Sequence, residues 1–246
     1  MSREPDISFI CKKAGLKYPV MGLYDTPNKG SYGDFVPVKS CVFSYFSLLV
    51  KGRHIRITKD QYGCGGAGGW LCGLETRSRE EYVSFLTDQE GLKANHGLME
   101  LWLDSVKPYL PEHENLFFGP LVPSEYGYLK TVTFFVDPDQ LSIFSIGAQL
   151  ESKPADPEPV IAPFGSGCMQ LISLFRDLEQ PQAIIGATDM AMRQHLPLPV
   201  LAFTVTRPMF ERLARVTGDS YLTKSFIQTL KQERKKQGYS SERADS

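Results

Sequence analysis

The stretch that decides the fold is Thr131-Val-Thr-Phe-Phe-Val136, which is followed directly by Asp137-Pro138. β-Branched and aromatic residues fill the first six positions, and this composition predicts a strand. The proline fits the first turn of a helix, because its missing N–H would have no partner there. The unit therefore predicts a strand that runs straight into a helix.

The same unit recurs further along the chain. Leu201–Thr206 has the composition of a second strand, and Arg207-Pro208 opens a second helix. Upstream of each unit lies a mostly apolar segment with a cysteine at its start, Cys41–Val50 in one case and Met169–Leu178 after Cys168 in the other. A narrow polar stripe at steps of three and four residues predicts that both segments are helices.

This repetition predicts a single α+β domain over residues 1–222, with a mixed β-sheet and two halves related by duplication, at about 18–150 and 151–222. A helix and two strands in the same order also recur by chance in mixed folds, and that alternative stays open. Residues 223–246 predict a charged C-terminal helix followed by a disordered tail.

Composition and charge narrow the function classes. The 246 residues are 42% hydrophobic, which is enough for a packed core, and 27 basic against 28 acidic side chains give a net charge of -1. Such a balance provides no field that would recruit nucleic acid. No apolar run approaches the roughly 20 residues of a membrane span, and Met1–Asp6 is polar. We therefore expect a cytoplasmic protein with reduced cysteines and no membrane or nucleic-acid partner.

The densest local feature is a glycine loop, in which residues 63–69 read Gly-Cys-Gly-Gly-Ala-Gly-Gly. Successive backbone N–H groups of such a loop form a nest for a small anionic ligand or a cofactor, next to a basic strand with Arg53 and Arg56. The loop has neither the ending of a P-loop nor the spacing of a dinucleotide fingerprint, and the alternative is a tight structural turn. The residues predicted to bind are Gly63, Gly65, Gly66, Ala67 and Gly68.

Three cysteines come from segments that favour a thiolate. Ser40 is predicted to cap a helix that has Cys41 in its first turn, Cys168 stands at an equivalent helix start, and Cys64 lies among the N–H groups of the glycine loop. Thiolates at Cys41, Cys64 and Cys168 would suit an iron–sulfur cluster or another thiolate-bound metal, although the chain has no Cys-x-x-Cys pair. The alternative is that these cysteines are buried core residues.

Cys64 and Asp189 are the candidate catalytic residues. Glycines on both sides leave the Cys64 thiol unscreened, and Asp189 follows an apolar strand, where it would act as a general base if a cysteine lies opposite. The alternative for Asp189 is that it caps the turn that follows it.

An ordered set of segments carries a family resemblance. These segments are Cys41, Cys64-Gly65-Gly66-Ala67, Gly119-Pro120-Leu121, Phe134 to Gln140, Gly165 to Cys168, and Ile185 to Asp189. In this order they resemble the prokaryotic family catalogued as domain of unknown function 169, over about 18–221. The resemblance implies a cytoplasmic bacterial or archaeal protein of unassigned activity and provides no catalytic residues.

Three functions follow from these features. The first is a cysteine-centred metal, iron–sulfur or thiol redox site, and the second is a binding module that holds a small anionic ligand or cofactor without chemistry. The third is a structural or partner-binding protein with inert cysteines.

Overall fold

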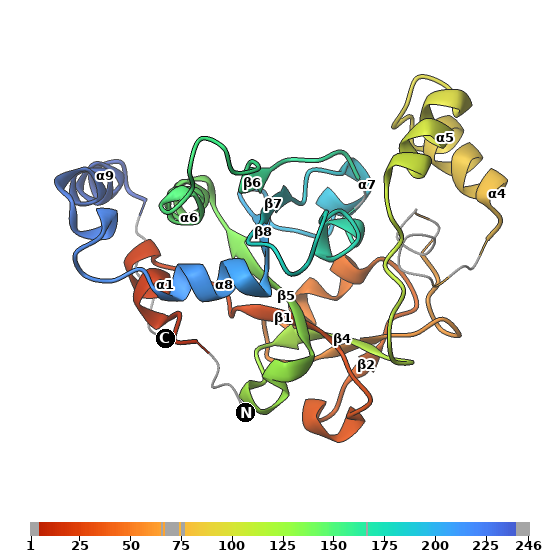
Figure 1. Ribbon diagram of the computed structural model, residues 1–246, viewed down its shortest axis with the longest axis horizontal. Coiled ribbons are helices and arrows are strands. Elements are labelled where there is room, and N and C mark those ends of the chain that lie inside the picture. The colour runs from red at the N-terminus through yellow and green to blue at the C-terminus, as the bar shows by residue number, and fades with distance from the viewer. Residues whose placement is uncertain (1–4, 65, 67–73, 75–76, 166, 240–246) are drawn as a thin grey trace.

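A computed structural model describes residues 5–64, 66, 74, 77–165 and 167–239. Its centre is an eight-stranded mixed sheet in the order β2-β3-β4-β1-β5-β8-β7-β6 (Figure 1). The strands are β1 (Met21–Asp25), β2 (Val36–Pro37), β3 (Ile55–Ile57), β4 (Leu116–Pro120), β5 (Leu129–Val136), β6 (Val160–Ile161), β7 (Ala183–Gly186) and β8 (Leu201–Thr206). The predicted α+β class with a mixed sheet is confirmed.

Helices of several types surround the sheet. The α-helices are α1 (Ser8–Ala14), α2 (Phe46–Leu49), α4 (Arg79–Ser84), α5 (His96–Ser105), α6 (Pro138–Gln149), α7 (Met190–Arg193), α8 (Arg207–Ala214) and α9 (Ser225–Lys236). The 3₁₀ helices are η1 (Lys29–Tyr32), η2 (Val42–Tyr45), η4 (Pro123–Tyr128), η5 (Met169–Leu171) and η6 (Tyr221–Thr223), and η3 (Phe85–Gln89) is a π-helix. No helix in the described part of the chain combines the length and the hydropathy that a bilayer crossing requires.

The two predicted strand–proline–helix units are present, and their strands pair near the middle of the sheet. Strands β5 and β8 pair antiparallel, and the hydroxyls of the facing residues Thr133 and Thr204 lie 2.9 Å apart. Asp137 begins α6 with a capping box, because its carboxylate accepts from the Gln140 N–H while the Gln140 side chain accepts from the Asp137 N–H. Thr206 caps α8 in the same position.

Alternation along the strands divides the core into two layers. Phe134 and Val136 of β5 pack with α1, α6 and α8 on one face of the sheet (Figure 1). Phe135 points to the opposite face, where Phe43 of η2 and Phe46 of α2 contact it edge-on. Cys41, Cys64 and Cys168 all pack at the margin of this second layer.

The prediction of two α-helices that begin at Cys41 and after Cys168 is wrong. Cys41–Val50 is not one α-helix capped by Ser40, since Cys41 is itself the residue before the 3₁₀ helix η2, which leads into the single turn of α2. After Cys168 the helix is only η5, and turns follow it. The stripe residue Gln170 is buried and bonds to backbone at Gly165 and Ala187, so the stripe reflects buried polar contacts and not a solvent-facing helix edge.

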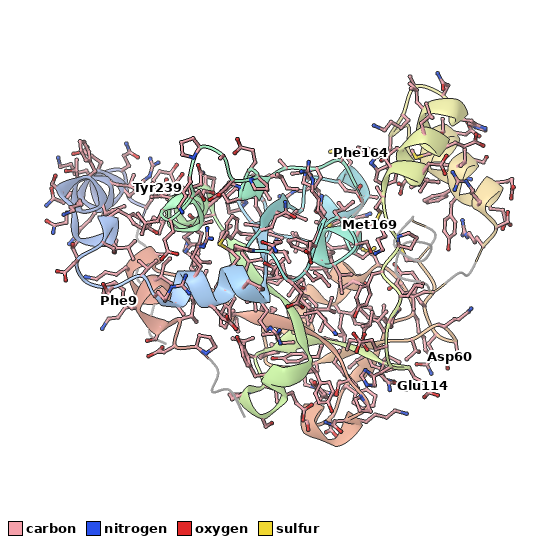
Figure 2. The ribbon with its side chains drawn as sticks, viewed as in Figure 1. Phe9, Asp60, Glu114, Phe164, Met169 and Tyr239 are labelled. Atoms are coloured by element: carbon pink, nitrogen blue, oxygen red, sulfur yellow. The ribbon has the colours of Figure 1, made fainter. Side chains whose placement is uncertain are left out.

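A helical hairpin of α4, η3 and α5 stands at one side of the sheet (Figure 1). It docks through Phe164 and Met169, which Figure 2 places on the side of the hairpin that faces the sheet. The Phe164 ring contacts Trp102 of α5 edge-on at 4.8 Å between centroids, and the Lys93 ammonium lies over its face. The hairpin therefore rests on the same segment that carries Cys168.

The sheet edges bear on the predicted duplication. Each edge is a parallel pair, β2 with β3 and β6 with β7, and each pair is followed inward by an antiparallel neighbour. The first half has β4 and β1 between its edge pair and β5, so the two halves differ in size. Duplication stays a prediction. The predicted charged C-terminal helix is present as α9, and the predicted tail over 240–246 lies outside the described residues.

Candidate functional site

The glycine loop lies directly against the segment that carries Cys41. Gly63 meets the backbone of Lys39 so closely that a Cβ atom there would overlap the Lys39 carbonyl oxygen. Cys64 is the next residue on one side of this contact, and Cys41 is two residues beyond it on the other. Close backbone approach of this kind requires glycine, so packing alone explains why residue 63 is a glycine, independent of any ligand.

Cys64 is half-buried, and its sulfur has a backbone donor. The Gly66 N–H points at the Cys64 Sγ with 3.5 Å between nitrogen and sulfur. The prediction that loop N–H groups face the Cys64 sulfur is therefore supported at Gly66, while Gly65, Ala67 and Gly68 lie outside the described residues.

Cys41 differs from the low-pKa thiol that its position predicts. The N–H groups of Phe43 and Ser44 do favour its thiolate, as a helix start should, but burial outweighs them and raises the pKa of Cys41 to about 11. The charges of Cys64 and Asp189 raise this pKa further, so both groups lie within electrostatic range of the Cys41 sulfur. Cys41 is therefore a protonated thiol at neutral pH.

Cys168 occupies the equivalent place before η5 but has different surroundings. The Tyr62 hydroxyl lies 3.3 Å from its sulfur. Both residues line an apolar cavity of about 20 Å³ against the sheet. Tyr62 is two residues before Cys64, so the glycine loop contacts the Cys168 segment through this tyrosine.

Asp189 stands at the end of β7, after a strained residue. Ala187 is buried and has a φ of 65°, a left-handed conformation that costs about 1 kcal/mol or more for a non-glycine residue. The Gln170 side chain holds it by accepting from its N–H at 2.7 Å. Asp189 then caps α7 by accepting from the Ala191 N–H at 2.9 Å. The alternative prediction, that Asp189 caps the turn after it, is confirmed. Its charge also acts on Cys41, as described above.

Glu90 also belongs to this site, and the sequence analysis did not identify it. The π-helix η3 continues helix α4 as far as Gln89. The N–H of the next residue, Glu90, donates to the carbonyl oxygen of Phe85, which is the bonding pattern of a π-helix. Its Oε2 atom is buried and has no hydrogen-bond partner among the described residues. Burial, with a smaller contribution from the charge of Asp189, raises the pKa of Glu90 to about 7. The glycine at position 91 indicates only the end of the helix, and the sequence does not distinguish Glu90 from an exposed glutamate.

The two arginines of the basic strand beside the loop have partners outside the loop. Arg53 donates to the Asp34 carbonyl, and Arg56 donates to Asn115 and lies over the Phe35 ring. Among the described residues, no group of three or more His, Cys, Asp or Glu side chains is arranged to hold a metal ion. The metal assignment of Cys41, Cys64 and Cys168 and the cofactor assignment of the glycine loop stay predictions.

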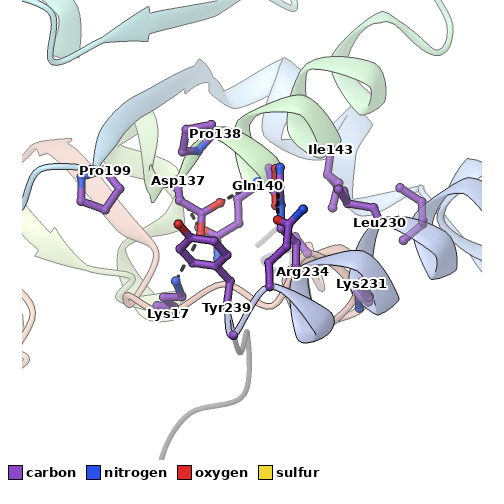
Figure 3. Close-up of a pocket in the computed structure, with 15 residues that line it drawn as sticks. Lys17, Asp137, Pro138, Gln140, Ile143, Pro199, Leu230, Lys231, Arg234 and Tyr239 are labelled. Carbon is purple, nitrogen blue, oxygen red and sulfur yellow. Dashed lines mark hydrogen bonds and ion pairs between the residues drawn. The ribbon is translucent and has the colours of Figure 1, made fainter.

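A larger cavity of about 630 Å³ lies elsewhere, between α9, the start of α6 and the end of α1 (Figure 3). Two ion pairs line it. Lys17 bonds Asp137 at 3.2 Å, and Arg234 bonds both carboxylate oxygens of Asp139. Tyr239 covers one end of it.

Comparison with known proteins places this chain in a family. Residues 10–215 match the family described as uncharacterised ArCR, domain of unknown function 169. The chain belongs to this family. No curated protein and no solved structure matches the chain.

Four of the segments that carry the family resemblance lie together at the cysteine site. They contain Cys41, Cys64, Gly167 and Asp189. A Cβ atom on Gly167 would overlap Met192 of α7, which brings the Cys168 loop against the helix that Asp189 caps. We therefore take the place where these four loops meet as the candidate functional site.

Proposed function

We propose that this protein carries a dithiol–disulfide redox site, in which Cys64 is the attacking thiol and Cys41 the resolving thiol. The observation that carries the proposal is the backbone contact between Gly63 and Lys39, which places the loops of these two cysteines against each other. The electrostatic effect of Cys64 on Cys41 supports the same proximity.

The two cysteines are suited to different steps. Cys64 has a backbone donor on its sulfur and attacks one sulfur of a disulfide substrate, whose S–S bond breaks to release one thiol. Cys41 starts as a protonated thiol and loses its proton to Asp189 as it attacks the Cys64 sulfur. The second thiol leaves with a proton, so the substrate gains two electrons and the protein holds a Cys41–Cys64 disulfide.

Peptide mapping without reductant tests this proposal. The reduced protein is treated with 2-hydroxyethyl disulfide and digested. We expect a linked peptide pair that contains Cys41 and Cys64. Cys41→Ser should trap the mixed disulfide at Cys64, Cys64→Ser should leave Cys41 unmodified, and Cys11→Ser should behave as wild type. Absence of the linked pair together with an unmodified Cys64 would overturn the proposal.

A three-thiolate metal or iron–sulfur site at Cys41, Cys64 and Cys168 is the second candidate. All three cysteines pack at the margin of the same core layer, which supports it. Among the described residues, however, no three or more His, Cys, Asp or Glu side chains are arranged to bind a metal ion. We therefore prefer the dithiol function. Metal content after anaerobic purification separates the two.

A further inference from the structure

The cavity beneath α9 is framed by two attachments of this helix to the rest of the molecule. Just before the helix starts, the Tyr221 hydroxyl donates to the Ile143 carbonyl oxygen at 2.7 Å, and the next residue, Leu222, is buried. Near its end, Arg234 donates to both carboxylate oxygens of Asp139, at 2.6 Å and 2.9 Å. These contacts hold the middle of α9 beside the first turns of α6, and the cavity of about 630 Å³ lies between the two helices (Figure 3).

The walls of this cavity are mainly apolar. Six apolar residues line it: Ala14, Pro138, Ile143, Pro199, Ile227 and Leu230. Ile227 and Leu230 are only half-buried, and α9 has no fully buried residue. Apolar side chains without close neighbours forgo dispersion contacts and remain partly hydrated, so an apolar molecule that fills the space would be bound favourably.

The charged groups of the lining favour an anion. Lys17, Lys231 and Arg234 line the cavity against Asp137 and Asp139, which makes three positive charges and two negative ones. Both carboxylates already have a cation, Lys17 for Asp137 and Arg234 for Asp139. Lys231 takes part in none of the ion pairs between described residues. Lys17 retains further N–H donors, because an ammonium group has three.

Polar and apolar groups are separated along the cavity. Figure 3 shows Lys17, Asp137 and Tyr239 together at one end, and Ile143 and Leu230 at the other. The volume lies within the range of roughly 300 to 1,000 Å³ that is usual for small-molecule sites. A molecule with an apolar body and one charged end matches this separation.

We propose that this cavity binds a small amphipathic carboxylate of the size of a medium-chain alkanoate. The apolar chain of the ligand packs against Ile143, Ile227 and Leu230, and its carboxylate accepts from the Lys17 ammonium and the Tyr239 hydroxyl. The proposal goes beyond the dithiol function, because no residue of this lining belongs to the four loops of the cysteine site.

Calorimetry with three probes of equal chain length tests the proposal. The probes are octanoate, 1-octanol and octylamine, each used below the concentration at which it aggregates. We expect octanoate to bind at least about tenfold more tightly than octylamine at low salt, and about 0.5 M salt should reduce this difference. Octanoate should also raise the midpoint of thermal unfolding, since it binds the folded protein. Equal affinity for octylamine would overturn the carboxylate assignment, and no binding of octanoate would overturn the site.

Variants on two faces of α9 locate the apolar part of the site. Leu230→Trp fills the cavity and should abolish the binding of octanoate and octanol. Phe226→Ala is the matched control, because Phe226 is on the exposed side of the same helix and should leave both affinities unchanged. Octanoate binding that persists in Leu230→Trp would show that the ligand lies elsewhere.

A second pair of variants tests the charged end and does not depend on the packing of α9. Lys17→Met should weaken octanoate binding about tenfold and leave octanol binding unchanged. Lys235→Gln removes a charge from α9 outside the cavity and should bind octanoate as wild type does. An unchanged octanoate affinity in Lys17→Met would contradict the position of the carboxylate. Cys41→Ser and Cys64→Ser should bind octanoate normally, so this site and the dithiol function can fail separately.

Discussion

Gly63 leaves no room for a side chain beside the carbonyl oxygen of Lys39. Gly63→Ala must push the glycine loop away from the segment before η2, and it should lower the free energy of unfolding by about 2 kcal/mol. The same displacement should slow formation of the Cys41–Cys64 disulfide. Gly30→Ala is the matched control, because nothing lies within 4 Å of a Cβ at that position. Equal stability of the two variants, measured by urea denaturation, would show that the loops are not in contact.

The cysteines should differ widely in reactivity. Burial raises the pKa of Cys11 to about 12 and that of Cys41 to about 11, whereas Cys64 has a backbone donor on its sulfur. Timed alkylation with iodoacetamide at pH 7.5 should therefore label Cys64 first and Cys11 last, with rates at least tenfold apart. A Cys64 that reacts no faster than Cys11 would remove the support for an attacking thiol.

Metal ions provide a test of the three-thiolate site. If Cys41, Cys64 and Cys168 share an ion, zinc or ferrous iron added before the reagent should protect all three from alkylation, and a chelator should restore labelling. Under the dithiol function we expect Cys168 to label at the same rate with and without metal. Cys168→Ser should likewise leave any metal effect on Cys64 unchanged, and joint protection of the three cysteines would favour the metal site instead.

Glu90 should make stability depend on pH. Its pKa rises from an ordinary value of 4.5 to about 7 on folding, so the folded protein binds more protons than the unfolded chain between these values. Wild-type stability should therefore fall as the pH rises through this window. Glu90→Gln removes the effect and should gain roughly 1 to 2 kcal/mol relative to wild type between pH 4.5 and pH 8, after allowance for its half-exposed side chain.

Denaturation of both proteins at several pH values measures this difference. Glu158→Gln, which removes a carboxylate from an exposed loop, should track wild type throughout. A constant offset between Glu90→Gln and wild type across the pH range would mean that Glu90 titrates normally.

Asp25 should be the most sensitive carboxylate for stability. It is fully buried at the end of β1 and accepts from the Tyr109 hydroxyl at 2.5 Å, from the N–H groups of Glu112 and His113, and from the His113 ring. Asp25→Ala leaves these donors unpaired and should cost roughly 3 kcal/mol. Asp34→Ala, at an exposed position, should change stability by less than about 0.5 kcal/mol in the same denaturation experiment.

Sequence predicted the parts of this fold that are determined locally. The strand at Thr131–Val136 and the helix after Pro138 follow from composition and capping, which act within a few residues. The helical spacing of Gln170 and Ser173 predicts a helix after Cys168, and this prediction is wrong beyond the 3₁₀ turn of η5. Both side chains are buried, and the contact of Gln170 with Ala187 depends on a strand that comes later in the chain.

The candidate site likewise contains residues that the sequence predicts and residues that it does not. Cys41, Cys64 and Asp189 stand out by residue type and by their place beside glycines or strand ends. Glu90 could not be found from sequence, because its burial and its proximity to Asp189 arise from the packing of a helical hairpin against a distant loop. Nor could sequence show that burial would outweigh the N–H groups around the Cys41 sulfur.

The antiparallel pairing of β5 with β8 joins the two parts of the chain that supply the site. Lys39, Cys41 and Cys64 belong to the part that ends with β5, Asp189 belongs to the part that contains β8, and the connection between the parts runs through an exposed loop at 153–158. A protease that cuts this loop would leave six consecutive residue pairs of the β5–β8 seam in place. The nicked protein should therefore stay assembled and reactive, and its two fragments, separately expressed and mixed, should restore a site in which Cys41 and Cys64 of the first fragment face Asp189 of the second.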